Sequence, residues 1–363
     1  MSTRSRSLSA ISGLLCAAGV LVACTLTQSL DYLQKGDGPT DGSVEGSAGD
    51  SGGEAGGRTP TVLVPNQTKP GFLAQDATTL YWIAGGMVMS VPKSGGTPKV
   101  LVAVPQSASG LVAEPDPAGA VFVVNGSTVL RVPKDGTAGG VVFTAGAGDP
   151  PTDRIAASAS GLYVLQYDQS ATVDGSRILR MAKNGGAVVD LAPDAGPTTL
   201  NLDAKSVFWL SSDDAARASI IEQAENSAPG TRTAVYSLST NDDLPTLSAD
   251  IAIDDTSLYW ITTDATSSAA EIVARKRQAS ASVVAIHRGA VEDTFANVSL
   301  DATHAYFLET RRSSLLRVPK NGGDVETLLV GLKAPSGLVV DGTAIYLTVE
   351  ATGNTGQVLV LTK

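Results

Sequence analysis

Few residues of this chain have the types and spacing that reaction chemistry requires. The two histidines, His287 and His304, form no His-x-x-x-His or similar pair, so the sequence offers no common zinc-ligand spacing. The two cysteines, Cys16 and Cys24, lie near the N-terminus, which leaves no thiolate cluster for zinc or for an iron–sulfur group. We therefore expect packed or exposed histidines, no catalytic residue, no metal and no cofactor.

The elements that would position any site are repeated along the chain. Five copies place an Asp five residues before an aromatic ring, and four copies place a Lys before a Gly-containing turn. A unit that recurs about every 40 to 50 residues predicts a β-propeller, because single blades cannot bury their apolar faces alone. The first signature reads DATTLYW from Asp76, DAKSVFW from Asp203, DDTSLYW from Asp254, DATHAYF from Asp301 and DGTAIYL from Asp341, and the second reads VPKSGG from Val91, VPKDG from Val132, MAKNGG from Met181 and VPKNGG from Val318.

Equivalent aromatic positions set the number of units. They predict an all-β, seven-bladed propeller over residues 60–363, with six or eight blades as alternatives and four antiparallel strands in each blade. The aromatic positions are Tyr81, Phe122, Tyr163, Phe208, Tyr259, Tyr306 and Tyr346.

The last unit contains sequence for only three strands. A β-rich segment, Thr61-Val62-Leu63-Val64, precedes the first unit and would supply the missing outer strand of the last blade. Pairing the two ends of the chain in this way closes the ring and removes an exposed edge. We therefore expect an N-terminal strand in the last blade.

The residues of the unit have local structural reasons. The Asp at the end of the first strand can accept backbone N–H groups in an Asx turn, and Gly-Gly supplies positive φ in the hairpin after the third strand. The aromatic rings of the second strand are expected to pack between blades. Units two and three depart from the Asp pattern at Pro117 and Ser158, and units four and five carry residues 221–226 and 275–279 in place of the Lys-Gly-Gly turn.

The N-terminal residues have the order of a secretory signal, with Arg4 and Arg6 before an apolar stretch over residues 8–23. The stretch ends in Leu21-Val22-Ala23-Cys24, which resembles a bacterial lipobox. The resemblance implies a signal peptide over 1–23, a diacylglycerol on Cys24 and attachment to a membrane. Thr25 in place of an aspartate resembles default sorting to the outer membrane, with the protein on the periplasmic or surface face of the cell envelope.

A polar tether follows the lipidated end. Residues 24–59 form the predicted linker, and from Gly36 to Thr59 the composition is Gly, Ser, Asp and Glu with almost no large apolar residue. Such a segment cannot bury enough surface to offset the entropy lost on ordering. We expect it to hold the propeller clear of the lipid headgroups.

The repeat resembles the YWTD unit of low-density-lipoprotein-receptor-type propellers. Tyr81-Trp82 and Tyr259-Trp260 keep the Tyr-Trp pair, and Arg131, Arg180 and Arg317 keep the arginine of the third strand. The Thr-Asp of that motif is absent after Trp82, and the pattern is also similar to NHL-type and TolB-type bacterial propellers. The resemblance implies the fold and a tendency to bind protein partners, with no catalytic residue.

A propeller carries the loops between strands two and three, and the connections between blades, on one face, which we call the loop face. Its longer loops predict a surface for a protein or cell-envelope partner on a monomeric protein. The formal net charge of −10 argues against nucleic acid as that partner. The candidate residues of this surface are Tyr167, Asp168, Asp213, Asp214, Arg217, Asp264, Glu309, Arg311 and Arg312.

The alternative is a metal-dependent propeller hydrolase or lactonase. Such an enzyme needs Asp, Glu or Asn side chains that project from the innermost strands into the central channel. The first strands offer mostly small apolar residues there, and Glu114, Asn201 and Asn297 are isolated candidates. The sequence therefore favours a binding or scaffolding module.

Overall fold

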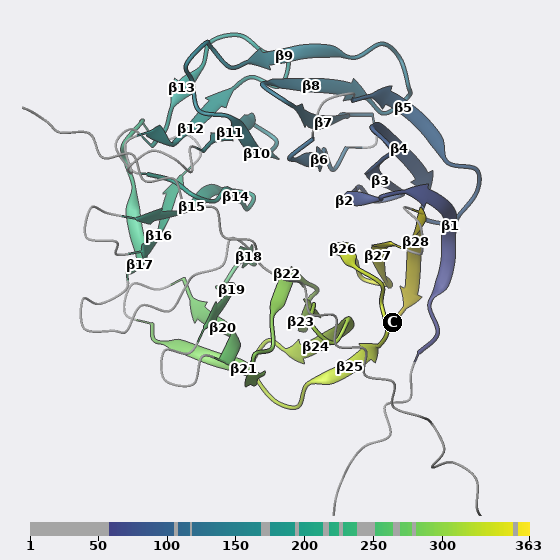
Figure 1. The fold of residues 1–363 in the computed structure, drawn as a ribbon. Coiled ribbons are helices and arrows are strands. Elements are labelled where there is room, and N and C mark those ends of the chain that lie inside the picture. The colour runs from purple at the N-terminus through teal and green to yellow at the C-terminus, as the bar shows by residue number, and fades with distance from the viewer. Residues whose placement is uncertain are drawn as a thin grey trace, which may run out of the picture. The chain divides into compact units, whose positions relative to one another are not determined.

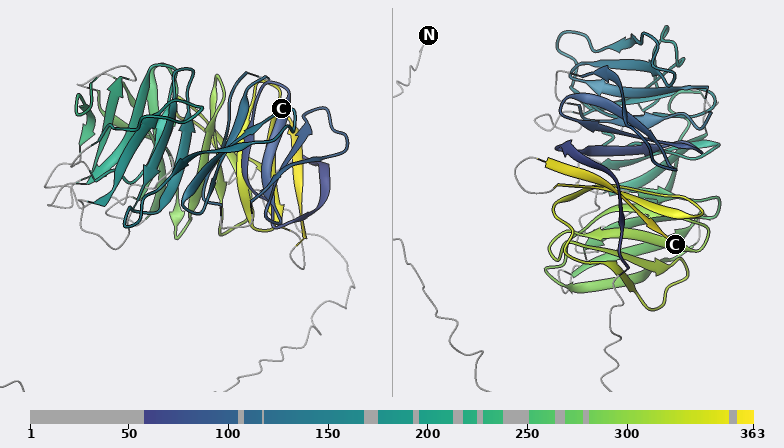
Figure 2. Two further views of the ribbon diagram at one scale, coloured as in Figure 1. Left: turned by 90° about the horizontal axis from the view of Figure 1, so that it is seen from above. Right: turned by 90° about the vertical axis from the view of Figure 1, so that its right-hand side faces the viewer.

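The computed structural model describes residues 58–363 except for short gaps, and seven four-stranded antiparallel sheets in this part form a ring (Figure 1). The prediction of a seven-bladed propeller is confirmed. Figure 2 shows the ring from two sides, with strands that run between its two faces. The residues outside the described part are 1–57, 105–107, 117, 168–174, 193–195, 213–217, 225–227, 238–250, 264–268, 278–280 and 351–354.

Blades 1 to 3 are each built from consecutive strands. Blade 1 comprises β2 (Gly71–Gln75), β3 (Thr79–Ala84), β4 (Met87–Pro92) and β5 (Lys99–Ala103). Blade 2 comprises β6 (Leu111–Ala113), β7 (Ala120–Asn125), β8 (Thr128–Pro133) and β9 (Gly140–Thr144). Blade 3 comprises β10 (Thr152–Ala157), β11 (Leu162–Gln166), β12 (Arg177–Met181) and β13 (Val189–Asp190).

Blades 4 to 6 repeat this order. Blade 4 comprises β14 (Asn201–Leu202), β15 (Ser206–Ser212), β16 (Ala218–Ala224) and β17 (Thr233–Ser237). Blade 5 comprises β18 (Ile251–Ile253), β19 (Ser257–Thr263), β20 (Ala269–Lys276) and β21 (Val283–Val291). Blade 6 comprises β22 (Phe295–Leu300), β23 (His304–Glu309), β24 (Ser314–Pro319) and β25 (Glu326–Leu329).

Blade 7 joins the two ends of the propeller. It comprises β26 (Pro335–Val340), β27 (Ala344–Glu350), β28 (Thr355–Thr362) and, as its outer strand, β1 (Thr61–Thr68). Strand β1 pairs antiparallel with β28, and it runs beside β28 at the right of Figure 1. The predicted closing strand is therefore confirmed, and it is longer than the four residues expected.

The core lies in layers between neighbouring blades because successive side chains of a strand point to opposite faces of its sheet. Trp82 is fully buried with Tyr346 of blade 7, whereas the adjacent Tyr81 packs with Val121 and Val123 of blade 2. The rings of the second strands thus fill the gaps between blades, as predicted. Figure 1 shows that these gaps are spaced around the whole ring.

The predictions about the N-terminal region concern residues outside the described part. These are the signal peptide, Cys24 and nearly all of the linker. Within the described part, no helix has the length and apolar character needed to cross a membrane.

Candidate binding surfaces

The turn after the first strand of blade 1 holds an ion pair between two blades. Oδ1 of Asp76 accepts hydrogen bonds from the backbone N–H groups of Thr78 and Thr79, both at 2.8 Å, which confirms the predicted Asx turn. Its Oδ2 accepts a hydrogen bond from the hydroxyl of Tyr81 at 2.7 Å and pairs with Nζ of Lys134 in blade 2 at 2.8 Å. The ammonium group lies over the Tyr81 ring, 5.4 Å from its centroid. We call such an acid, its cation from the next blade and the neighbouring ring an inter-blade clamp.

The same ion pair recurs around the ring. In each of these blades, one residue of the third strand pairs with the aromatic residue of the second strand. The lysine or arginine of the clamp follows that third-strand residue by three positions. A clamp that uses an aspartate and a lysine also joins blades 5 and 6, 6 and 7, and 7 and 1. These pairs are Asp254–Lys320 at 2.9 Å, Asp301–Lys363 at 2.6 Å and Asp341–Lys93 at 2.9 Å.

Two further boundaries carry variants of the clamp. In blade 2, Glu114 takes the place of the aspartate, accepts the backbone N–H of Ala120 and pairs with Lys183 of blade 3 at 2.6 Å. Unit two therefore departs from the Asp pattern, as the sequence predicts, and a longer turn sets Glu114 farther from the second strand than the aspartates of the other units. Between blades 4 and 5, Arg277 contacts Asp203 and lies 4.9 Å from the ring centroid of Phe208.

The boundary between blades 3 and 4 has a different turn. Oγ of Ser158 accepts the backbone N–H groups of Ser160 and Gly161, so the serine shapes the turn without bringing a charge. The position of the clamp cation in blade 4 holds Glu225, which lies outside the described residues. Both members of the usual pair are thus replaced at this boundary.

The clamps that use an aspartate and a lysine keep their carboxylates ionised. Burial by itself would raise the pKa of Asp76, but the hydrogen bonds from Lys134, Thr78 and Tyr81 outweigh it and lower the pKa to about 2. The pKa of Asp254 is lowered to about 2 in the same way, with Lys320 as the cation. Burial and the hydrogen bond to Asp301 raise the pKa of Tyr306 to about 12, so the Tyr306 hydroxyl stays protonated.

The predicted charged loop of blade 6 lies on the loop face between β23 and β24. The carboxylate of Glu309 is almost fully buried and accepts the backbone N–H groups of Arg311 and Arg312. Arg311 then pairs with Glu292, and Nη2 of Arg312 lies 3.2 Å from Oδ1 of Asp293, both in the connection from blade 5. The structure therefore brings these three predicted residues together. Glu309 holds the shape of its own loop through these hydrogen bonds.

A pocket of about 230 Å³ lies beside this loop, between blades 5 and 6. Asp293, Glu309 and Arg312 contribute charged groups, and Phe295 and His287 contribute aromatic rings. His287 packs with ring centroids 5.5 Å from both Phe295 and Phe307, as expected for a packed histidine. Burial lowers its pKa and outweighs the opposing effect of Asp293, so the imidazole is neutral near pH 7.

The other predicted loop residues are placed as follows. Tyr167 is half-buried and packs against the apolar cluster between blades 3 and 4. Its role in partner binding stays a prediction. Asp168, Asp213, Asp214, Arg217 and Asp264 lie outside the described residues.

The residues considered for the hydrolase alternative belong to three different blades. Glu114 belongs to a clamp, and Nδ2 of Asn297 donates to the backbone carbonyl of Ser336 at 3.2 Å. Asn201 lies on β14, the innermost strand of another blade. Within the described residues, no group of three or more His, Cys, Asp or Glu side chains is arranged to hold a metal ion.

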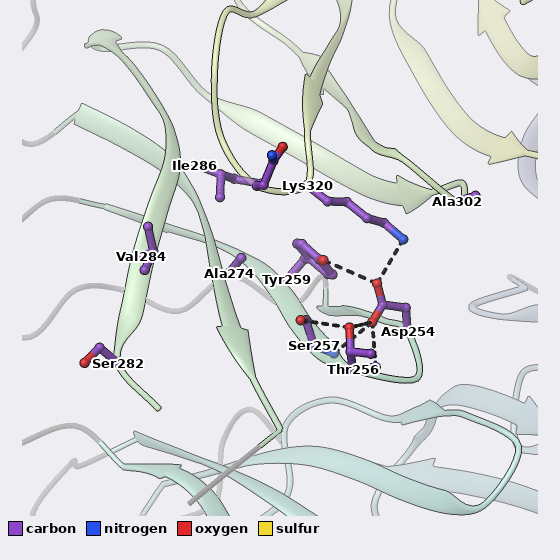
Figure 3. Close-up of a pocket in the computed structure, with 11 residues that line it drawn as sticks. Asp254, Thr256, Ser257, Tyr259, Ala274, Ser282, Val284, Ile286, Ala302 and Lys320 are labelled. Atoms are coloured by element: carbon purple, nitrogen blue, oxygen red, sulfur yellow. Dashed lines mark hydrogen bonds and ion pairs between the residues drawn. The ribbon is translucent and has the colours of Figure 1, made fainter. Parts of the chain in front are cut away.

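A second pocket, of about 360 Å³, lies at the opposite end of the boundary between blades 5 and 6 (Figure 3). The turns between strands one and two and between strands three and four share this side, which we call the turn face. Figure 3 shows Asp254 between Lys320 and the hydroxyl of Tyr259, with Ala274 and Val284 along the neighbouring strands. The sequence does not predict this pocket, because its walls come from ordinary strand residues of two blades.

Comparison with known proteins supports the fold. No protein-family model and no curated protein matches the chain. Among solved structures, an oligogalacturonate lyase in complex with manganese is similar, with a TM-score of 0.63 and 12% identity over 86% of this chain and 94% of the lyase. The AfRom2 CNH domain gives a TM-score of 0.56 at 9% identity, covering 84% of this chain and 99% of that domain.

A puromycin hydrolase has a TM-score of 0.56 and 11% identity, and the match covers 85% of this chain and 54% of the hydrolase. At such low identity these likenesses concern the fold alone. A closer kinship with YWTD-type propellers stays a prediction from the repeat. The chain is a β-propeller by both its own strand topology and these comparisons.

Proposed function

We propose that this protein is an envelope lipoprotein whose propeller binds a partner protein through the loop face at blades 5 and 6. The observation that carries the proposal is the order of the loop of Glu309, Arg311 and Arg312. Hydrogen bonds hold this loop together, and ion pairs join it to the connection from blade 5. A surface that is already ordered loses little conformational entropy when it binds. Its side chains combine exposed guanidinium groups with a neighbouring pocket, which suits recognition of a protein surface.

The direction of β1 supports this choice of face. Thr61 pairs with Val360 near the end of β28, whereas Thr68 pairs with Thr355 at its beginning. The chain therefore enters the propeller on the turn face, where Arg58 lies 3.4 Å from Glu326 of blade 6. A tether attached on that side leaves the loop face free for a partner.

Site-specific crosslinking in cells tests the binding face. A photoreactive amino acid in place of Arg312 should yield a defined crosslinked product, because this position would lie in the interface. The matched control places the same amino acid at Asp135, an exposed residue in the turn of blade 2 on the turn face. Equal products from both positions, or none from position 312, would contradict the proposed face.

The anchor has a separate test. In our proposal the thiol of Cys24 carries the lipid, so Cys24→Ala should move the protein from the membrane fraction to the soluble fraction of the envelope. Incorporation of labelled fatty acid provides the direct readout. A Cys24→Ala protein that still sediments with membranes and still carries label would overturn the anchor without affecting the binding face.

A further inference from the structure

One residue of the innermost strands has a backbone conformation that its side chain does not favour. Phe72, the second residue of β2, has a φ of +49°, in the left-handed region that bulky residues rarely adopt. Phe72 is also 44% exposed, whereas Leu73 beside it packs against the apolar cluster of blades 7 and 1. Strand β2 borders the central opening of the ring (Figure 1). Among the described residues of the first strands, Phe72 is the large apolar residue that stays exposed.

A β-bulge explains the backbone of this position. The register of β2 with β3 shifts between Gly71 and Ala74, so two residues of β2 oppose one residue of β3. A bulge changes the direction in which the side chains of a strand point. Here Leu73 lies against blade 7, where a Cβ added to Gly337 would be only 2.8 Å from the Cβ of Leu73. The left-handed backbone thus serves the packing of Leu73, but it does not require a phenylalanine at position 72.

Blade 6 contains the same bulge with a residue that suits it. The register of β22 with β23 shifts between Ala296 and Ser299, and Asn297 has a φ of +57°. Asn297 and Phe72 are equivalent, because each lies two residues before the residue that pairs with the second-strand tyrosine. Asparagine tolerates the left-handed region, and Nδ2 of Asn297 donates to the carbonyl of Ser336 in blade 7. The fold therefore accounts for the asparagine, whereas Phe72 neither suits the backbone nor is buried.

Phe72 lies at the loop face. The first strand of each blade begins at the connection from the previous blade, and Phe72 is near the beginning of β2. Hydrogen bonds hold this end of the blade in place. Oγ of Ser336 donates to the carbonyl of Pro70 at 2.8 Å, and the N–H of Gly85 donates to the carbonyl of Thr68 at 2.7 Å. An exposed ring on a backbone held in this way loses little conformational entropy when it binds.

We propose that Phe72 is an apolar anchor that enters an apolar pocket of the partner protein at the loop face. Aromatic anchors contribute a large share of the binding energy of protein interfaces, and charged residues surround them. Only blade 7 separates blade 1 from blade 6 in the ring, so one partner can contact both Phe72 and the loop of Arg311 and Arg312. Met87, which is 38% exposed at the loop-face end of β4, adds apolar area in blade 1. The inference rests on the proposed function, because it takes the loop face as the binding face. The chain enters the propeller on the turn face, which favours a protein over a lipid surface as the occupant.

The substitution Phe72→Asn copies blade 6 and separates a structural role from a binding role. Because asparagine suits the left-handed backbone and the lost ring is exposed, the thermal midpoint should stay the same or rise. Val141→Asn is the control, since it removes a valine that is 57% exposed on the outer strand of blade 2. A midpoint that falls by more than about 2 °C in Phe72→Asn would show that the ring supports the fold, and it would overturn the proposal.

Crosslinking in cells measures the binding role. The photoreactive residue p-benzoyl-phenylalanine in place of Phe72 should give a product with the same partner as the photoreactive residue in place of Arg312. The yield from position 312 should fall at least tenfold in the Phe72→Asn variant and stay unchanged in the Val141→Asn variant.

The outcomes of this experiment separate the anchor from the binding face. No product at position 72, a different partner at the two positions, capture of a phospholipid at position 72, or an unchanged yield from position 312 in Phe72→Asn would overturn the anchor. A defined product from position 312 in any of these cases would leave the proposed face standing. No product from either position would contradict both proposals.

Discussion

The boundary between blades 3 and 4 differs from the other six boundaries in how it is held. Elsewhere a buried or half-buried ion pair joins the first turn of one blade to the next, as between Asp76 and Lys134. At the exceptional boundary, Ser158 replaces the acid. The ring nevertheless continues through this boundary with the same strand order.

Apolar packing explains why the ring tolerates this exception. Between blades 3 and 4, Tyr163, Leu165, Ile178 and Trp209 are fully buried in one cluster. Burying such side chains stabilises by roughly 1.5 to 3 kcal/mol each, whereas a buried ion pair returns little net energy after desolvation. The comparison indicates that the apolar layers hold the blades together, and that the clamps add to a contact already formed.

The largest effect is expected from opening the ring. Deletion of residues 61–68 leaves the edge of β28 unpaired and removes Val64 from the core, where it is almost fully buried. We expect the loss to exceed about 5 kcal/mol, which is comparable to the whole stability of many domains. Thermal unfolding followed by circular dichroism should show no cooperative transition near that of the intact chain. Deletion of residues 38–57 is the control, and an unchanged transition in the 61–68 deletion would show that the closing strand is dispensable.

We expect smaller losses of stability from substitutions in the turns, and the loss should be larger at a boundary with a clamp than at the boundary between blades 3 and 4. The side chains of Lys134 and Asp76 are 4% and 1% exposed, so Asp76→Asn leaves a buried ammonium without its counter-ion and should cost about 3 kcal/mol. Ser158→Ala removes neutral hydrogen bonds from an exposed turn and should cost about 1 kcal/mol. Urea denaturation of both variants measures the difference. Equal costs would mean that the charge of the clamp has no special role.

The smallest effect concerns acid stability. The folded-state pKa of Asp254 is about 2, below its ordinary value of 3.8, so the clamp contributes stability that is complete above about pH 5 and is lost as the pH falls toward 2. Asp76 behaves in the same way. Asp254→Asn removes one such group, so its free energy of unfolding should depend less steeply on pH between 4 and 2 than that of the unmodified protein. Urea titrations at several pH values test this, and an unchanged slope would contradict it.

Much of the fold could be predicted because each blade repeats local signals. The Asp turn, the alternating strands and the Gly-Gly hairpins act over a few residues, and the structure confirms them; Gly95 and Gly96, for instance, have φ values of +89° and +126°. The relation between the two signatures could not be predicted in this way. Lys134 meets Asp76 across 58 residues, and nothing in the spacing of either motif identifies the other as its partner.

The candidate sites were less predictable than the fold. The sequence identified Glu309, Arg311 and Arg312 as charged loop residues, but the buried position of Glu309 follows from hydrogen bonds to its own loop. The pocket on the turn face combines Tyr259 and Ala274 of blade 5 with Lys320 of blade 6, and the sequence does not show that these residues meet. A pocket between blades is lined by residues of two sheets, whereas each copy of the sequence repeat describes only one sheet.

The sequence by itself determined the repeat, the strand order and the closing role of the segment at Thr61–Val64, and it favoured seven blades over six or eight, because periodic apolar residues and turn residues act locally. Tertiary structure alone decided which acid meets which cation, that Glu114 replaces the aspartate in blade 2, and where pockets open. Those outcomes depend on side chains from different blades that approach one another only after the ring has closed, so their energies are set by burial and distance in space.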